Sequence, residues 1–136
     1  MAEKTFHFEI ITPEKVLLSE EIDSLEAPGV DGEFQIFADH TPFLTGLDAG
    51  QVTCTHRNQK KYISVSGGFC EVMPDKSVIL AQTAELANEI DKKRAESARD
   101  RAKKRMEAKD DPSIDSERAR MALLRALTRL RVADIK

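Results

Sequence analysis

The last part of the chain holds arginines in a pattern suited to binding anions. Five of them stand between Glu117 and Asp134 with no carboxylate among them: Arg118, Arg120, Arg125, Arg129 and Arg131. A guanidinium group binds a phosphate or a carboxylate through two parallel hydrogen bonds. Several such groups on one helix repel one another unless an anion or an acidic surface compensates their charge. The pattern therefore predicts a phosphate ligand or an acidic protein partner, and the alternative is a solvated basic surface.

Other residue types that carry chemistry show no matching pattern. The sequence contains neither G-x-x-x-x-G-K-[ST] nor G-x-G-x-x-G, the two common phosphate-binding loops. The three histidines, His7, His40 and His56, lack the spacing of metal ligands. Asp39 and His40 are adjacent, but no nucleophile motif accompanies them. We therefore expect no metal site and no catalytic residues.

The arginines belong to an internal repeat that predicts two helices. The hexamer Ile90-Asp91-x-x-Arg94-Ala95 recurs 24 residues later as Ile114-Asp115-x-x-Arg118-Ala119. Further pairs match at the same offset: Ala98 with Ala122, Arg101 with Arg125, Ala102 with Ala126, and Arg105 with Arg129. Both copies are rich in helix formers, and residues 110–113 combine a helix stop with a helix start. We expect antiparallel helices at about 89–107 and 113–132, packed through their alanines.

The preceding part of the chain has the pattern of an all-β domain. Phe6, Phe8 and Ile10 alternate with polar neighbours, as in a strand with one buried face. Similar short apolar segments follow, and turn sequences such as Pro28-Gly29 separate them. Eight or more short strands in about 85 residues predict a β-sandwich or a flattened barrel.

Charge divides the chain at the same place. The sequence has 136 residues, of which 40% are apolar and 33% charged. Residues 1–85 hold 6 basic and 14 acidic side chains (net −8) and residues 86–136 hold 15 and 10 (net +5), which sum to −3. We predict an α+β protein with a β domain at 1–87 and an antiparallel two-helix hairpin at 88–136. With no long apolar segment, no leader and two cysteines, we expect no membrane span, no secretion and no disulfide framework.

The ordered motifs of the chain resemble the epsilon subunit of F-type ATP synthases. The motifs are Pro28-Gly29-Val30-Asp31-Gly32-Glu33-Phe34, His40-Thr41-Pro42-Phe43-Leu44-Thr45, Gly50 and Ser66-Gly67-Gly68-Phe69-Cys70-Glu71-Val72. The opening Ile11-Thr12-Pro13 and the repeated hexamer fit the same family, so that the resemblance covers essentially the whole chain. It implies a ten-stranded β-sandwich followed by a two-helix domain.

The resemblance also implies a place in the central stalk of a rotary machine. The chain would be a non-catalytic rotor subunit that couples proton-driven rotation of the c-ring to ATP synthesis. Its sandwich would grip the gamma subunit and would meet the c-ring through loops at one end. Those loops are Val30, Asp31, Gly32, Glu33, and His40, Thr41, Pro42. If exposed, Phe43 or Phe69 would be natural anchors of such an interface, and the alternative is that both belong to the core. As a peripheral protein without direct membrane insertion, it would lie on the cytoplasmic face of a bacterial inner membrane, or on the stromal face of a thylakoid.

For the helices, the resemblance implies regulation. Extended along gamma, they would inhibit ATP hydrolysis, and an acidic segment of the beta subunit would pair with Arg118, Arg120, Arg125, Arg129 and Arg131. Folded on the sandwich, they would bind ATP, with or without Mg²⁺, as a regulatory ligand and not as a required cofactor. The matching residues are Glu85, Ile90, Asp91, Arg94, Ala95, Arg101, Arg125 and Arg129. Ile90 and Ala95 would flank the adenine, whereas Asp91 has the alternative role of capping a helix or pairing with Arg94.

A nucleic-acid-binding module that places its basic helices on phosphates is the alternative from a different class. Against it, every aromatic side chain available for base stacking lies between Phe6 and Phe69, in the acidic half. The net charge of the chain is also negative. We therefore expect no nucleic-acid partner.

Overall fold

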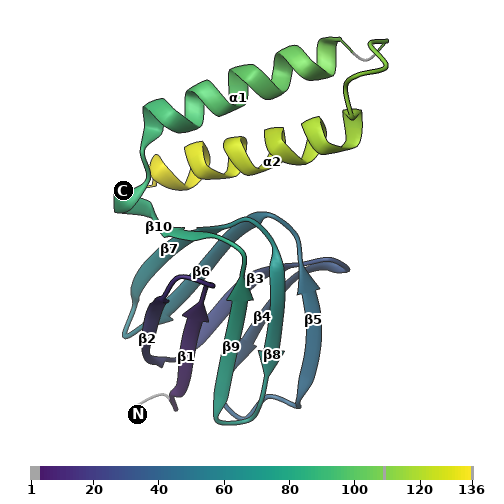
Figure 1. Cartoon of the computed structure of the whole chain (residues 1–136). Helices are drawn as coiled ribbons and strands as arrows, with labels where there is room; N and C mark the ends of the chain where they lie inside the picture. The colour runs from purple at the N-terminus through teal and green to yellow at the C-terminus, as the bar shows by residue number, and fades with distance from the viewer. Residues whose placement is uncertain (1–3, 109, 136) are drawn as a thin grey trace.

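The computed structural model describes residues 4–108 and 110–135, which form a β-sandwich with a helical hairpin folded against it (Figure 1). The strands are β1 (Phe6–Ile11), β2 (Val16–Ile22), β3 (Ser24–Gly29), β4 (Gly32–Phe37), β5 (Phe43–Leu47), β6 (Gly50–His56), β7 (Gln59–Val65), β8 (Gly68–Val72), β9 (Lys76–Ala81) and β10 (Ala84–Leu86). A short 3-10 helix, η1 (Ala87–Glu89), leads to the helices α1 (Lys92–Glu107) and α2 (Ser116–Ala133). The predicted ten-stranded sandwich followed by two helices is confirmed.

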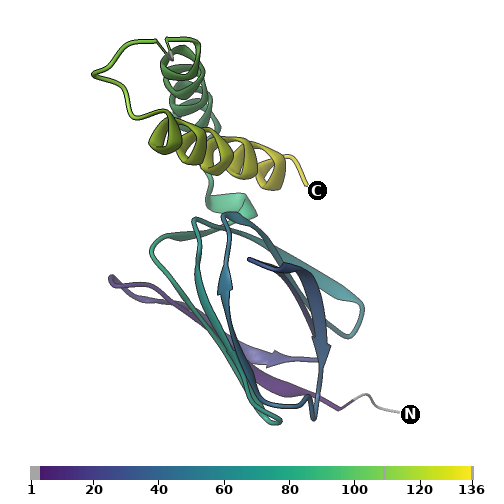
Figure 2. The same ribbon diagram turned by 90° about the vertical axis from the view of Figure 1, so that its right-hand side faces the viewer.

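The strands pair in the order β10-β7-β6-β3-β5-β8-β9-β1-β2, with β4 added on β3. The β1–β9 pair is parallel, and the other strand pairs are antiparallel. Figure 2 shows that the sheet curves until its two halves face each other. The apolar residues between them form the main core, and all of them belong to the sandwich. The sandwich therefore has a core that does not depend on the helices.

The alternation along β1 has the predicted effect on burial. Phe6, Phe8 and Ile10 are almost fully buried, whereas His7 and Glu9 lie on the opposite face. Each buried side chain of this size contributes about 1.5–3 kcal/mol through the removal of apolar surface from water. The pleat of the strand thus sets which face of β1 joins the core and which carries polar groups.

Both helices begin at the aspartate of the repeated hexamer. The Asp91 carboxylate accepts a hydrogen bond of 3.1 Å from the N–H of Arg94, and Asp115 accepts one of 3.1 Å from the N–H of Arg118. These bonds satisfy backbone donors that the first turn of a helix leaves free. The expected starts at 89 and 113 are therefore too early, because Asp91 and Asp115 are the N-caps. The repeat itself is a pair of helix-start signals.

Alanines form the seam between the two helices. Ala95 and Ala102 of α1 and Ala119 and Ala126 of α2 are all buried, and they occupy matching positions of the repeat. Small side chains allow two helix backbones to approach closely. The helix α2 lies between α1 and the sandwich, where it contacts β6, β7 and η1 (Figure 1). The predicted packing of the hairpin through its alanines is thus present, and α2 is the helix that docks it.

Candidate anion-binding cleft

A cleft of about 580 Å³ lies between the sandwich and the folded hairpin. Its walls come from the β1–β2 turn, the end of β7, the β9–β10 region, η1 and both helices. The side chains and backbone around it are those of Thr12, Glu14, Lys15, Ser64, Val65, Ser66, Gln82, Thr83, Ala84, Glu85, Glu89, Arg94, Ala98, Ala122, Arg125, Ala126 and Arg129. The helical wall is lined by alanines and by arginines.

One ion pair closes part of this cleft. The Arg129 guanidinium donates to both carboxylate oxygens of Glu85, with Nε–Oε1 at 2.6 Å and Nη2–Oε2 at 3.2 Å. The two side chains are 20% and 33% exposed, so the pair is partly withdrawn from water. It joins α2 to β10 and neutralises Arg129 within this conformation. A paired contact of this geometry is stronger than a single exposed ion pair.

The remaining cations of the cleft have no such partner. Within residues 4–108 and 110–135, Lys15, Arg94 and Arg125 form no ion pair. The carboxylates that line the cleft besides Glu85 are Glu14 and Glu89. Once the Arg129–Glu85 pair is set aside, three cations face two carboxylates, a net charge of +1. The cleft can therefore accept an anion that contacts both the sandwich and the helices.

The structure brings together half of the predicted nucleotide-binding set. Glu85, Arg94, Arg125 and Arg129 line the cleft. The other predicted members, Ile90, Asp91, Ala95 and Arg101, are not among its lining residues. Three of them have an identifiable reason: Asp91 caps α1, Ala95 is fully buried in the helical seam and Arg101 is exposed farther along α1. Capping, the alternative role foreseen for Asp91, is therefore the role that this conformation shows.

Sequence reasoning missed the contribution of the β1–β2 turn. Thr12, Glu14 and Lys15 line the cleft from the side of the sandwich. Nothing in the local sequence marks this turn as part of a site, because turns with charged residues are common on protein surfaces. What makes the turn part of the cleft is its position next to β9 and the folded hairpin, which is visible only in the structure.

The five arginines predicted to meet an acidic partner have different environments. Arg120 pairs with Glu117 one turn earlier, at 2.5 Å, and this contact raises the pKa of Arg120 and lowers the pKa of Glu117. Arg129 pairs with Glu85. Arg131 lines a second groove of about 480 Å³ together with Glu26 and Glu33, without an ion pair to either.

The sequence predicts that the arginines need negative charge from outside their own segment. Arg129 receives it from Glu85 of β10, whereas the expectation is wrong for Arg120, because Glu117 of the same helix supplies its counter-charge. Within the part of the chain that the structure describes, Arg118, Arg125 and Arg131 form no ion pair. Arg118 and Arg131 are also exposed, so they remain available to an acidic surface.

The two loops predicted to share one end of the sandwich lie at opposite ends of β4. The β3–β4 turn holds Val30, whose N–H donates to the carbonyl oxygen of Gly46 near the end of β5. The other loop, residues 40–42, precedes the start of β5, and the N–H of Asp39 donates to Pro74 just beyond β8. The six residues of β4 separate the loops by roughly 20 Å. The expectation of a shared end is therefore wrong, because an antiparallel strand carries the chain from one end to the other.

An apolar strip runs across the outer face of β5, β8 and β9. Leu44, Phe69 and Leu80 are 68%, 59% and 52% exposed, and Phe69 and Leu80 are direct partners in the β8–β9 register. Phe43 is instead half-buried and packs edge-to-face on Phe34, with ring centroids 5.3 Å apart. Of the two candidate anchors, Phe69 is therefore exposed and Phe43 is directed to the core. Exposed apolar strips of this kind mark protein-binding surfaces.

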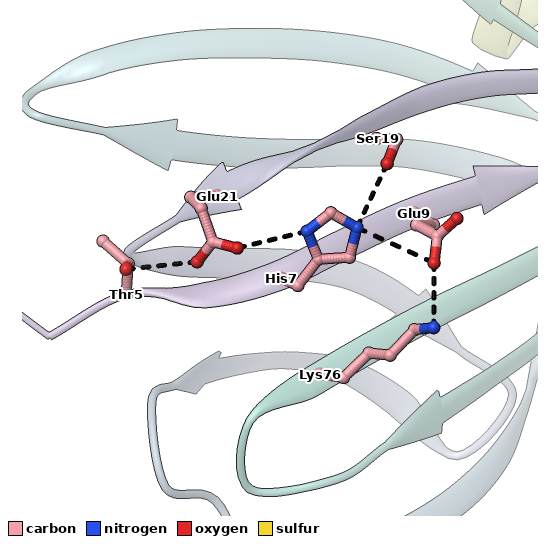
Figure 3. A network of polar contacts seen from close by, with 6 residues as sticks. All are labelled: Thr5, His7, Glu9, Ser19, Glu21 and Lys76. Carbon is pink, nitrogen blue, oxygen red and sulfur yellow. Dashed lines mark hydrogen bonds and ion pairs between the residues drawn. The ribbon is translucent and has the colours of Figure 1, made fainter.

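A separate polar cluster lies on the outer face of β1 (Figure 3). The His7 ring nitrogen Nδ1 is 3.1 Å from Glu21, and Nε2 is 3.1 Å from the Ser19 hydroxyl and 3.7 Å from Glu9. Lys76 of β9 pairs with Glu9 at 2.9 Å and lowers the pKa of that carboxyl group. The cluster joins β1, β2 and β9 by side chains as well as by backbone bonds. Among the described residues there is no group of three or more His, Cys, Asp or Glu arranged to bind a metal ion.

A β-sandwich followed by a helical hairpin is the architecture of a known class of protein. The model of the β-sandwich domain of the ATP synthase delta/epsilon chain matches residues 5–87, and the model of the long α-helix domain of the same chain matches residues 88–134. The chain belongs to this family of ATP synthase subunits. None of the described helices is both long and apolar enough to span a bilayer.

Within the family, the similar curated proteins are epsilon chains. The chain is 45% identical over 130 residues to the ATP synthase epsilon chain of Nitratidesulfovibrio vulgaris, covering 96% of each protein. It is 44% identical over 131 residues to that of Desulforamulus reducens, covering 96% of this chain and 98% of the relative. The predicted resemblance to the epsilon subunit is thus confirmed.

Solved structures share the fold. A chain of the mitochondrial ATP synthase of Euglena gracilis matches with a TM-score of 0.79 and 19% identity, over 91% of this chain and 78% of that one. A chain of the central stalk and c-ring of the Tetrahymena thermophila enzyme matches with a TM-score of 0.58 and 13% identity, over 98% and 96%. At these identities the comparison concerns the fold alone.

Proposed function

We propose that this chain is a non-catalytic subunit of the rotor, located in the central stalk at the cytoplasmic face of a bacterial inner membrane, and that it couples proton-driven rotation to ATP synthesis. The observation that carries the proposal is the match to epsilon chains along nearly the full length of both proteins. Proton-coupled rotation and ATP synthesis are the functions of this family. Reconstitution of the ATP synthase with and without the chain tests the proposal, because loss of the chain should uncouple proton flow from ATP synthesis.

The apolar strip is the surface that we assign to the gamma subunit. Leu44, Phe69 and Leu80 stand on neighbouring strands, and a rigid sheet presents them without reorganisation. Phe69 has the large exposed ring expected of an interface anchor. Phe69→Ser should weaken association with gamma, whereas the matched exposed Phe37→Ser on β4 should not. Equal binding by both variants and by the unmodified chain would contradict the assignment.

For the c-ring, we propose the β3–β4 turn over the loop at residues 40–42. Val30, Asp31 and Glu33 are exposed, and their side chains form no ion pair within the described residues. The His40 ring is instead occupied, since its Nδ1 lies 2.7 Å from the carbonyl oxygen of Thr41 and the ring lies beside that of Phe43 in a tilted arrangement, with centroids 5.3 Å apart. Cysteine crosslinking from Asp31 and from Thr41 to the polar loops of the c-subunits distinguishes the two ends. Crosslinks from Thr41 alone would reverse the assignment.

For the hairpin, we propose inhibition of ATP hydrolysis when it leaves the sandwich and meets an acidic segment of the beta subunit. In the folded state Arg125 and Arg129 face the cleft, so they become available to a partner only after the hairpin undocks. The main core lies wholly in the sandwich, so removal of residues 88–136 should leave that domain folded. The truncated chain should assemble into the rotor, and hydrolysis of ATP should rise. Unchanged hydrolysis would exclude inhibition.

For the cleft, we propose that ATP, with or without Mg²⁺, is a regulatory ligand that stabilises the folded hairpin. Arg94 of α1 and Arg125 of α2 face the same cavity without ion-pair partners, which suits a polyphosphate. Calorimetric titration of the full chain with ATP should show binding, and Arg94→Ala and Arg125→Ala should each weaken it. No heat with the unmodified chain at millimolar ATP would exclude this ligand.

A further inference from the structure

The β1–β2 turn holds a lysine at the rim of the cleft, opposite the helices. The N–H of Thr12 donates to the carbonyl oxygen of Lys15 at 2.9 Å, and the Lys15 N–H lies 3.3 Å from the Thr12 hydroxyl oxygen. The backbone of Lys15 is thus fixed by bonds to Thr12. Lys15 is an exposed residue that lines the cleft, and its side chain forms no ion pair within the part of the chain that the structure describes.

We propose that Lys15 is a phosphate-binding residue, through which a nucleoside polyphosphate in the cleft bridges the sandwich and the hairpin. The inference rests on the proposed binding of ATP and adds a residue to it. Lys15 would supply a cation from the sandwich, while Arg94 and Arg125 supply one from each helix. An ammonium group on a flexible stem adapts to a phosphate chain, whereas the guanidinium groups bind in a fixed plane.

The charges of the cleft support a role for this lysine. With the Arg129–Glu85 pair neutral, the cleft holds Lys15, Arg94 and Arg125 against Glu14 and Glu89. Replacing Lys15 by a neutral residue changes the net charge from +1 to 0 and removes the cation that the sandwich contributes to this cavity. The ligand would then still bind the arginines of the hairpin, but it would bind no cation of the sandwich. It would therefore no longer bridge the two.

Calorimetric titration of the full chain with ATP, ADP and AMP tests the inference. In Lys15→Gln the affinity for ATP should fall by about three- to ten-fold, the affinity for ADP by less, and the affinity for AMP hardly at all, since fewer phosphates meet the missing charge. Lys60→Gln is the matched control, because Lys60 is an exposed lysine that does not line the cleft. Lys15→Arg should restore most of the affinity, since it restores the charge.

A second readout measures the bridge itself. Saturating ATP should slow proteolysis of the hairpin in the unmodified chain and in Lys60→Gln, but less so in Lys15→Gln. If the unmodified chain binds no nucleotide, the proposed ligand and this inference both fail. If it binds ATP and Lys15→Gln binds it equally well, the role of Lys15 is excluded and the proposed ligand stands. If Lys15→Gln and Lys60→Gln lose affinity for ATP equally, the loss is an effect of the overall charge of the surface. That result would likewise exclude a bound phosphate at Lys15.

Discussion

Arg129 of α2 and Glu85 of β10 form a two-point ion pair across 44 residues of sequence, with N–O distances of 2.6 and 3.2 Å. Among the described residues, this is the one ion pair that joins the helices to the sandwich. It lies at the wall of the cleft, so the same contact helps to dock α2 and shapes the cavity. Undocking of the hairpin must break it.

Removal of this pair should loosen the hairpin without unfolding the sandwich. Glu85→Gln should lower the free energy of local opening of α2 by about 1–2 kcal/mol, because the partly buried Arg129 then keeps no charged partner. Hydrogen exchange of the α2 amides measures this opening, with the β1 and β9 amides as internal reference. The control is Glu117→Gln, which removes an exposed pair and a carboxylate in the first turn of α2, and it should change exchange by less than Glu85→Gln. Equal exchange in both variants would mean that the Arg129–Glu85 contact does not dock the hairpin.

Thr128 is a buried residue whose replacement should stabilise the docked hairpin. Its side chain is 1% exposed, and its hydroxyl oxygen has no hydrogen-bond partner in the described structure. Burial of an unpaired hydroxyl costs about 1–3 kcal/mol, so Thr128→Val, which keeps the shape, should raise the free energy of unfolding by about 1 kcal/mol. Thermal unfolding measures the change. Thr128→Ser keeps the hydroxyl but loses a methyl group, so it should destabilise the protein, and the opposite order of the two variants would contradict the argument.

The polar cluster on β1 predicts loss of stability in acid. Lys76 holds the pKa of Glu9 below its ordinary value of 4.5 through a direct hydrogen bond and its charge. A carboxyl group with a lowered pKa in the folded state stabilises the protein fully above its unfolded pKa, and this contribution disappears as the pH falls through the folded pKa. Unfolding experiments between neutral pH and acid should therefore show a steeper loss below about pH 4.5 in the unmodified chain than in Lys76→Met. Parallel curves would show that Glu9 and Lys76 are not coupled.

The two cysteines should be unreactive in the folded protein. Burial raises the pKa of Cys54 to about 12 and the pKa of Cys70 to about 11, so both stay as thiols at neutral pH. The thiolate is the reactive form, and access is also blocked by the core. A thiol reagent at pH 8 should label neither residue until the protein is unfolded with denaturant.

The same shifts set the response to alkali. A thiol whose folded pKa is raised gives a contribution to stability that is present below the unfolded value of 9.0 and is lost as the pH rises toward 11–12. Cys54→Ala should therefore flatten the loss of stability above pH 9. In the labelling experiment with the thiol reagent, rapid reaction of the native protein would contradict the burial of both thiols.

The sequence alone was sufficient for features that depend on a few neighbouring residues. The alternation of Phe6, Phe8 and Ile10 predicts the buried face of β1, because the pleat of a strand places every second side chain on the same side. The repeated hexamer predicts two helices, although the expected starts at 89 and 113 precede the N-caps Asp91 and Asp115 by two residues. The order of motifs along the chain was also enough to indicate the family.

Only the tertiary structure decided the site. Lys15 and Arg94 reach one cleft from distant parts of the sequence, and Glu85 meets Arg129 because α2 docks beside β7. The loops at Val30 and His40 lie apart for the same kind of reason, since β4, which pairs with β3 in antiparallel register, separates them. Such placements result from the summed burial of many apolar side chains across the core, and no local pattern of residues encodes that sum. Which charges are paired and which are free therefore follows from packing.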